Sequence, residues 1–316
     1  MKSWHAQFFV IGLLLLAAAI ATADPAVVEL LSLGRMNEAI SVLITRNDPV
    51  SAHLLSRAYY ATERWDNAVK YGERAVTLRP DEANYHLWLA REYGQKAANA
   101  NPLTAATLAR KAKNEFETAV QLDPVSVEAR LDLARYYTEA PAIMGGGVDK
   151  ARDQAAQVAK YNSAKSHLIL ARIAEKEKQF PQAESHLRQA IRQAKEPSEY
   201  WLDLAEFYRL RGRPDDMQKA VQSALAQSGV AADTYFEAAN ELFLGNRDCP
   251  DAILYLQKYL ASGGLVEDAP AFRAHFLLGQ IYEKMGQAPA AVSEYQASLA
   301  LASGFERARK ALSHLQ

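Results

Sequence analysis

The chain has 316 residues, and its 36 Lys and Arg residues nearly equal its 37 Asp and Glu residues, which leaves a net charge of −1. Nucleic-acid-binding domains carry a clear basic excess, so this balance argues against a nucleic-acid partner. The single cysteine, Cys249, excludes an intramolecular disulfide, and the seven histidines are too scattered to predict a metal site. We therefore expect no metal and no cofactor. Abundant Ala, Leu, Glu, Arg and Gln favour helices over strands.

The N-terminus has the pattern of a secretory signal peptide. Lys2 gives a positive start, Phe8–Ile20 is continuously apolar, and small residues occupy 21–23 immediately before Asp24. The apolar run is shorter than the ~20 residues that a transmembrane helix needs. Residues 1–23 are therefore predicted to be a signal peptide that is removed on export, which places the mature protein in a bacterial periplasm.

An uncleaved anchor is the alternative for the same segment. A stretch of ~20 residues is reached only when the segment is counted from Trp4 to Ala23. In that case the protein faces the periplasm while its N-terminus holds it in the inner membrane. This segment is the one membrane contact that the sequence predicts.

The next informative stretch, Val50–Pro80, predicts a helical hairpin. Apolar or small residues recur in it at helical spacing in two runs, which the polar residues 62–64 separate. Pro80 ends the second run, because proline stops a helix. Two helices of this length joined by a tight turn pack against each other in opposite directions.

This unit resembles the tetratricopeptide repeat (TPR), a helical hairpin of about 34 residues. In that family small side chains recur where paired helices approach closely, and in the first full unit they are Ser56, Ala68 and Ala75. The same spacing falls on Ala90, Ala112, Ala119, Ala134, Ala151, Ala171, Ala183, Ala190, Ala205, Ala224, Ala252, Gly279 and Ala291. The resemblance implies an all-α solenoid over residues 24–316 that winds as a right-handed superhelix. Its seven full repeats follow a shortened N-terminal unit over 33–44 and precede a capping helix, Phe305–Gln316.

Some segments depart from the repeat. Insertions fall near 97–103 and 140–148, between the helices of the second and third units, and a glycine pair within 262–268 is our candidate for a hinge. One unit cannot bury its own apolar face, so stacking is required. We therefore expect one continuous, rod-like domain.

No motif predicts catalysis, and we expect that the protein is not an enzyme. The run Gly145–Gly147 lacks the Lys and Ser/Thr of a phosphate-binding loop and follows a helix rather than a strand. We interpret it as the sharp turn of a long loop, with anion binding or an exposed rim at Ile143 and Met144 as alternatives. Cys249 falls where other units have an aromatic residue such as Trp65, so it is expected to be a buried structural thiol.

The strongest binding signal comes from the first helix of each unit, which lines the concave groove in TPR proteins. One groove-facing position holds arginine in four consecutive units, and a position one helical turn away holds leucine in three. These candidate binding residues are Arg57, Arg91, Arg135, Arg172, Leu87, Leu131 and Leu168. The equivalent positions become acidic in later units, at Glu206 and Glu241.

Arginine presents a planar fork of donors that suits carboxylates, so the row predicts an acidic protein or peptide ligand. The alternative is that these arginines pair with nearby carboxylates such as Glu128, Glu139 and Glu175. The resemblance implies a non-catalytic scaffold of the bacterial envelope that binds a partner protein in its groove. A membrane-tethered assembly component and an accessory subunit that handles a glycan chain are the other hypotheses.

Overall fold

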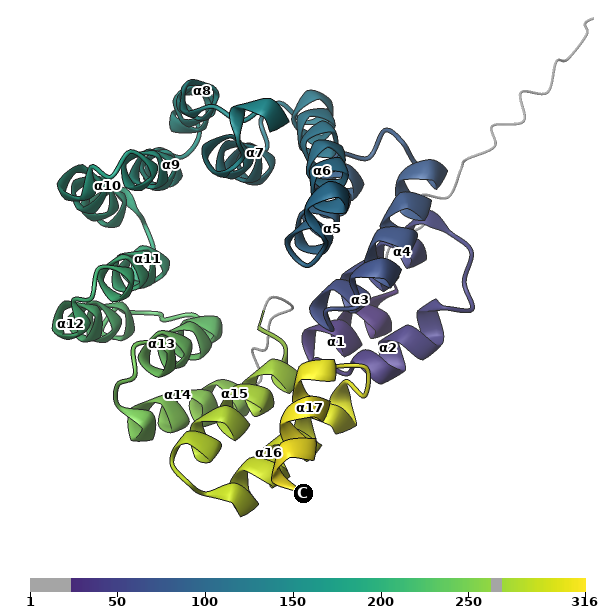
Figure 1. Cartoon of the computed structure of the whole chain (residues 1–316), viewed down its shortest axis with the longest axis vertical. Helices are drawn as coiled ribbons and strands as arrows, with labels where there is room; N and C mark the ends of the chain where they lie inside the picture. Colours follow the sequence, from purple (N-terminus) through teal and green to yellow (C-terminus); the bar gives the residue numbers. More distant parts are fainter. Residues whose placement is uncertain (1–23, 263–268) are drawn as a thin grey trace, which may run out of the picture.

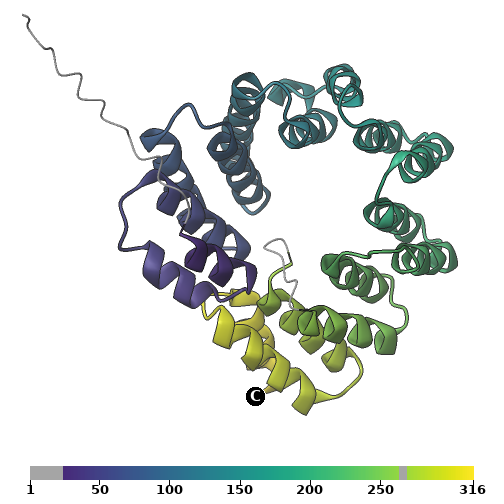
Figure 2. The ribbon, with the colours of Figure 1, turned by 180° about the vertical axis from the view of Figure 1, so that it is seen from behind.

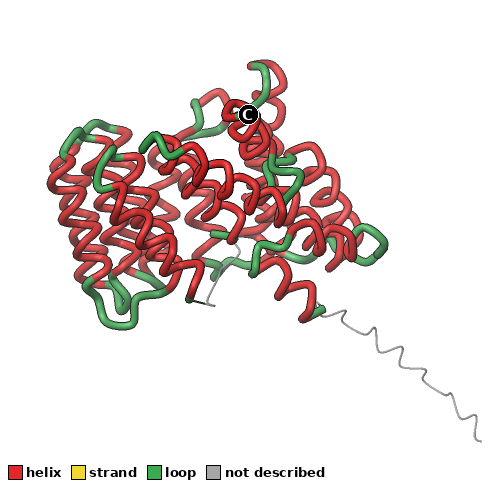
Figure 3. Tube along the Cα trace, turned by 90° about the horizontal axis from the view of Figure 1, so that it is seen from below, coloured by secondary structure: helices red, strands yellow, loops and turns green. Residues whose placement is uncertain are grey.

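The computed structural model describes residues 24–262 and 269–316, which form helices joined by short loops (Figure 3). In the first half the helices are α1 (Pro25–Ser32), α2 (Met36–Leu43), α3 (Pro49–Ala61), α4 (Trp65–Leu78), α5 (Ala83–Ala98), α6 (Pro102–Leu122), α7 (Val127–Glu139), η1 (Ala142–Met144, a 3-10 helix) and α8 (Val148–Ala159). In the second half they are α9 (Ser163–Lys176), α10 (Phe180–Gln193), α11 (Ser198–Leu210), α12 (Pro214–Leu225), α13 (Ala232–Leu244), α14 (Cys249–Ala261), α15 (Ala271–Lys284), α16 (Ala288–Leu301) and α17 (Glu306–Leu315). Within the described residues there is no strand, so the all-α prediction is confirmed.

Two predictions fall on segments outside this description. The predicted signal peptide, residues 1–23, precedes the first described residue, and the predicted hinge at 262–268 lies, apart from Ser262, between the two described ranges. Among the described helices, none has both the length and the apolar character that crossing a membrane requires.

Consecutive helices pair as hairpins, and one turn geometry recurs inside them. After α3, Glu63 adopts a positive φ of 60° while the amide of Arg64 donates to Tyr59 O at 2.9 Å. This pattern ends a helix by satisfying its last carbonyls. Lys178 and Asn246 occupy the same place in two later hairpins, and glycine does so at Gly212. The repeated turn gives the hairpins a common geometry.

The small residues of the repeat are buried where helices meet, as the sequence predicts. Ala68 and Ala75 on α4 are 0% and 1% exposed. At Gly279 a Cβ would lie 2.4 Å from Tyr295 Cε1, so no larger side chain fits there without displacing that ring. Tyr259 is an exception, since this large side chain is fully buried at a position where the repeat has a small residue.

The insertion near 97–103 lengthens two helices rather than forming a loop between them. Helix α5 has 16 residues and α6 has 21. The turn between them is only 99–101, and the Asn101 side chain caps α6 by accepting from Thr104 N at 3.1 Å. The extra residues are therefore placed as additional helical turns, because they contain no helix breaker before Pro102.

The segment 140–148 is a compact loop folded onto α7. Tyr136 Oη donates to Met144 O at 2.9 Å, and a Cβ on Gly146 would lie 1.9 Å from Ala140 O. These contacts explain the glycines as a sharp turn. Ile143 is 82% exposed, as the rim interpretation requires, whereas Met144 is half-buried.

The solenoid is a ring rather than a rod, so the expected shape was wrong (Figures 1 and 2). One hydrophobic cluster joins both ends of the described chain: Leu31 and Met36 share it with Phe272 and Phe305. Gly34, in the turn of the first hairpin, lies so close to α15 that a Cβ there would be 2.7 Å from Ala271 N. Each hairpin is rotated relative to its neighbour, and the rotations add up until the two ends meet.

The C-terminal helix forms part of this closure. Helix α17 begins at Glu306, and Phe305, its N-cap, is buried with its ring 5.1 Å from those of Phe272 and Phe276. Its Arg307 pairs with Glu63 of the first full unit at 3.2 Å. The helix predicted as a polar cap therefore packs at the seam between the two ends.

Candidate functional site

The inner side of the ring carries two adjoining clefts. Helices α7, α9 and α11 lie on this side, while their partners α8, α10 and α12 lie outside (Figure 1). One cleft has a volume of about 320 Å³ and the other about 170 Å³. Both are lined by Thr138, Leu168, Arg172 and Asp203, so they form one continuous depression, which we call the α7–α11 cleft.

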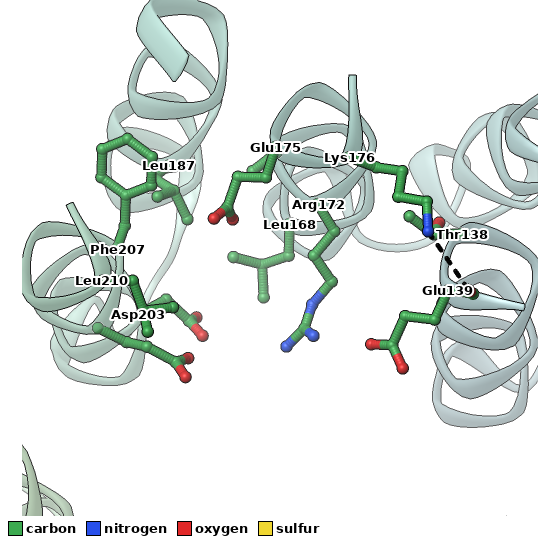
Figure 4. Close-up of a pocket in the computed structure, with 12 residues that line it drawn as sticks. Thr138, Glu139, Leu168, Arg172, Glu175, Lys176, Leu187, Asp203, Phe207 and Leu210 are labelled. Atoms are coloured by element: carbon green, nitrogen blue, oxygen red, sulfur yellow. Dashed lines mark hydrogen bonds between the residues drawn. The ribbon is translucent and has the colours of Figure 1, made fainter. Parts of the chain in front are cut away.

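Apolar side chains form much of the cleft surface. Leu168 separates the two parts, Leu131 lines the smaller one, and Leu187, Phe207 and Leu210 line the larger one (Figure 4). Leu210 is half exposed although it is apolar. Leu187 and Phe207 are only 4% and 3% exposed, so the accessible apolar surface comes from Leu131, Leu168 and Leu210. Apolar residues that lie together in a concave surface are typical of a binding site.

Arg57 and Arg91 lie outside this cleft, and both guanidinium groups contact the Trp88 ring. Their guanidinium carbons are 4.5 Å and 4.8 Å from its centroid. Arg91 also donates to Asp132 at 2.6 Å and to Glu128 at 2.7 Å. Arg91 therefore pairs with nearby carboxylates, including Glu128, as the alternative interpretation predicts.

Arg135 and Arg172 do line the α7–α11 cleft. Arg135 pairs with Glu139 one turn away at 3.1 Å, again as the pairing alternative predicts. Arg172 is exposed and forms no ion pair or hydrogen bond with a residue in the described ranges, although its charge, like that of Arg211, opposes the rise that burial causes in the pKa of Glu175. In Figure 4 its guanidinium points into the open space between Glu139 and Asp203.

The three leucines divide in the same way. Leu131 and Leu168 line the cleft beside Arg135 and Arg172. Leu87 is 3% exposed and belongs to the core, so it presents no surface to a ligand. The structure thus brings together four of the seven predicted residues and places Arg57, Leu87 and Arg91 elsewhere on the ring.

The acidic half of the groove is largely neutralised by its own basic residues. Arg209 donates to Glu241 at 2.8 Å and lies 3.7 Å from Glu206. Lys165 pairs with Glu199 across the α9–α11 contact. Burial raises the pKa of Glu241, and Arg209 opposes this rise.

Asp203 is the cleft residue that sequence reasoning missed. Its Oδ2 is buried and has no hydrogen-bond partner. Burial, followed by the nearby charge of Glu199, raises its pKa to about 7, while Arg172 and Lys165 act in the opposite direction. Asp203 lies four residues after Glu199 and three before Glu206, which places it on the groove face of α11. This spacing is the sequence feature from which Asp203 could have been predicted as a cleft residue.

The cleft has no arrangement that resembles a metal centre, and the described residues contain no group of three or more His, Cys, Asp or Glu suited to hold a metal ion. Cys249 packs against the core cluster at the start of α14, but it is half-buried rather than buried as the sequence predicts. The cleft offers an apolar surface, one guanidinium that forms no ion pair with a described residue, and one carboxyl group with a buried oxygen.

Comparison with known families finds the tetratricopeptide repeat. One model of this repeat matches residues 168–229 and 241–304, and a second matches residues 51–84. A comparison with curated proteins finds no match.

Several solved structures resemble the chain. A thermophilic TPR protein of Thermus thermophilus is 23% identical over 62% of this chain and 99% of its own, with a TM-score of 0.45. MamA is 20% identical over 46% of this chain and 81% of its own, with a TM-score of 0.38. The APC/C hetero-tetramer Cut9–Hcn1 contains a chain that is 14% identical over 88% of this chain and 59% of its own, with a TM-score of 0.43.

Proposed function

Because this chain belongs to the tetratricopeptide-repeat family, we propose that it is a non-catalytic scaffold that binds an extended segment of a partner protein in the α7–α11 cleft. Members of the family generally serve as scaffolds for protein–protein interaction. The observation that carries the proposal is the cleft itself, where Leu168 and Leu210 offer apolar contact beside the guanidinium of Arg172, which forms no ion pair with a described residue.

The shape of the ring supports an extended ligand. The cleft crosses three successive inner helices, so a bound segment contacts α7, α9 and α11 in turn. Leucine side chains from two of these units can then hold alternate apolar side chains of the ligand, while polar groups fix its register.

We place this scaffold in the bacterial periplasm, on the strength of the N-terminal pattern of residues 1–23. N-terminal sequencing of the protein from the envelope fraction should begin at Asp24. Recovery of full-length protein with the inner membrane supports the tethered form instead. Full-length protein in the cytosol contradicts both.

Site-specific crosslinking tests the binding surface. A photoreactive amino acid placed at Leu168, inside the cleft, should give a discrete adduct in intact cells. The same amino acid at Gln182, which is exposed on the outer helix α10, should not give that adduct. Equal adducts from both positions, or none from Leu168 and Leu131, would show that the inner surface is not the binding surface.

A further inference from the structure

A pair of histidines lies between the two helices of the α9–α10 hairpin. The Nδ1 atoms of His167 on α9 and His186 on the outer helix α10 are 3.1 Å apart, and the two ring planes are inclined by 29°. Both residues are half-buried, so the pair is not sealed from solvent. Neither histidine lines the α7–α11 cleft. The pair is therefore a separate feature, which the proposed function does not use.

The corresponding place in two other hairpins shows what is unusual about this pair. His275 on α15 also faces a residue 19 positions later, and its Nδ1 lies 2.7 Å from Glu294 on α16. In the second unit, where the insertion lengthens the spacing to 29 residues, His86 Nδ1 lies 2.5 Å from Glu115 on α6. Both of these pairs join an imidazole to a carboxylate. The α9–α10 hairpin instead has a second imidazole where the carboxylate stands.

Two imidazoles cannot form the ion pair that an imidazole forms with a carboxylate. A neutral imidazole has one N–H donor and one acceptor nitrogen, so a single N–H···N hydrogen bond satisfies both Nδ1 atoms when no ion is present. Burial, followed by the charges of His186 and Arg192, lowers the pKa of His167, and burial lowers the pKa of His186. Both rings therefore favour the neutral form, which is the form of histidine that binds metals.

The spacing of the two nitrogens suits a shared metal ion. Imidazole nitrogens bind transition metals at about 2.0–2.1 Å, so two of them on one ion are about 2.9 Å apart at a right angle and about 3.4 Å apart at a tetrahedral angle. The observed separation of 3.1 Å lies between these values. Imidazole suits copper, nickel and zinc, whereas magnesium, calcium and manganese prefer oxygen ligands. The pair therefore matches an ion of the first group.

Gln193 can orient His167 for either state. Its Nε2 lies 3.3 Å from His167 Nε2, so the amide donates to that nitrogen, while its Oε1 accepts from the Ser163 hydroxyl. In this arrangement the His167 proton is on Nδ1. A half-turn of the amide exchanges its oxygen and nitrogen, and the Ser163 hydroxyl then accepts instead of donating. The Gln193 oxygen now holds the His167 proton on Nε2, as carbonyl groups commonly do for metal-bound histidines, and Nδ1 is free for the ion.

We propose that His167 and His186 together bind one divalent transition-metal ion through their Nδ1 atoms, with Cu²⁺ bound most tightly. Two metal–nitrogen bonds replace the N–H···N hydrogen bond, and the His167 proton moves from Nδ1 to Nε2, so no proton is lost overall. Because the described residues contain no group of three or more His, Cys, Asp or Glu suited to a metal, water completes the coordination.

The sequence predicts no metal site because 19 residues separate the two histidines along the chain. Only the packing of α9 against α10 brings them together. A bound ion joins the inner helix of this hairpin to the outer one (Figure 1). Since it binds the folded hairpin and not the unfolded chain in this geometry, it should stabilise the protein.

Calorimetric titration of the full chain with Cu²⁺, Ni²⁺ and Mn²⁺ tests the site. We expect one equivalent of Cu²⁺ to bind most tightly, Ni²⁺ to bind more weakly and Mn²⁺ to bind least, which is the order for nitrogen ligands. Electron paramagnetic resonance of the Cu²⁺ form should show coupling to two imidazole nitrogens. The melting temperature should rise with the concentration of Cu²⁺.

Substitutions identify the ligands. His167→Gln and His186→Gln each leave one imidazole, so each should weaken the tightest Cu²⁺ binding by more than the ~10–100-fold that loss of a supporting group costs. His275→Gln, which removes a histidine that pairs with a carboxylate, is the matched control and should bind as wild type. His186→Glu copies the pair of His275 with Glu294, so it should fold as wild type and show coupling to one nitrogen only.

Three outcomes overturn the site: no two-nitrogen signal in wild type, a two-nitrogen signal that persists in His167→Gln or His186→Gln, or an equal loss of binding in His275→Gln. Circular dichroism without metal checks the folding of each variant, and the wild-type spectrum tests the proposal without any variant. The Leu168 crosslink tests the proposed function separately, so either result can fail while the other stands.

Discussion

Asn37 and Ser303 are joined by two hydrogen bonds although 266 residues separate them along the chain: the amide and the hydroxyl of Ser303 both donate to Asn37 Oδ1, at 2.9 and 2.8 Å. Asn37 Nδ2 in turn donates to Ala300 O at 2.9 Å. Both the oxygen and the nitrogen of this side-chain amide thus bind the opposite end of the solenoid. Arg273 adds a further contact by donating to Ala61 O at 2.9 Å.

This seam changes how the solenoid presents its inner face. In an open array the two terminal units leave apolar surface that a polar cap must cover. Here the first hairpin and the last helices cover each other, so the α7–α11 cleft lies on the inside of a closed ring opposite the seam (Figures 1 and 2). A stable seam keeps the curvature of the cleft fixed.

Gly34→Ala tests the seam. The substitution places a Cβ at 2.7 Å from Ala271 N, across the seam, and Gly34 also has a φ of +73°. Gly286 has nearly the same φ, +72°, but nothing lies within 4 Å of a Cβ there. Both variants carry the ~1–2 kcal/mol cost of left-handed backbone, so the comparison isolates the contact.

We expect Gly34→Ala to lower the free energy of unfolding by ~1–3 kcal/mol more than Gly286→Ala, because the tight contact must be relieved. Urea unfolding measures the difference, and small-angle scattering should show a larger radius of gyration for Gly34→Ala alone. Equal losses in the two variants would mean that the ends are not in contact in solution.

The buried carboxyl group of Glu92 makes stability depend on pH. It is fully buried and neither of its oxygens has a hydrogen-bond partner. Burial raises the pKa of Glu92 well above its usual range, Ser56 opposes this, and the charge of Glu73 adds to the rise. With the folded pKa above the unfolded one, the stability contribution is complete below the unfolded pKa and is lost as pH rises toward the folded pKa.

Glu92→Gln should remove this dependence. Above the unfolded pKa of about 4.5, wild type should lose up to ~1.4 kcal/mol per pH unit relative to the variant. Denaturant unfolding at pH 5, 6 and 7 measures the slope, and Glu29→Gln at an exposed position serves as the control. A constant difference between wild type and Glu92→Gln across this range would indicate that Glu92 is ionised in the folded state.

Replacing Arg91 and replacing Arg172 should have different effects on the free energy of unfolding. Arg91 has a side chain that is 20% exposed, with two carboxylate partners and the Trp88 ring as contacts. Its replacement by Gln should cost ~1–3 kcal/mol, because charged hydrogen bonds are lost and Asp132 loses its partner. Arg172→Gln should change the free energy of unfolding by less than ~0.5 kcal/mol, since its exposed side chain forms no ion pair or hydrogen bond with a described residue.

Thermal and urea unfolding of the two single variants measure these effects. Similar losses would contradict the assignment of Arg91 to structure and Arg172 to binding. A binding defect in Arg91→Gln at a temperature where it is fully folded would extend the binding surface toward Trp88.

The sequence alone determined the repeat and the local structure of its hairpins. Their helices follow from apolar periodicity, from Pro80 and similar stops, and from small residues such as Ala68 and Ala75, all of which act between residues close in the chain or in adjacent units. The same reasoning placed Leu131, Arg135, Leu168 and Arg172 on one inner surface, because a position repeated in each unit faces the same way in each unit.

Only the tertiary structure decided that the ends meet and which arginine remains unpaired. Closure depends on small rotations between successive hairpins that accumulate over the whole array, and no single unit encodes their sum. Arg91 and Arg172 occupy equivalent positions in their units. Arg91 forms ion pairs with Asp132 and Glu128 of the neighbouring helix α7. Within the described chain, Arg172 forms no ion pair with its own neighbouring helix, α11. The state of Asp203 is likewise set by burial between helices, which the sequence of α11 does not reveal.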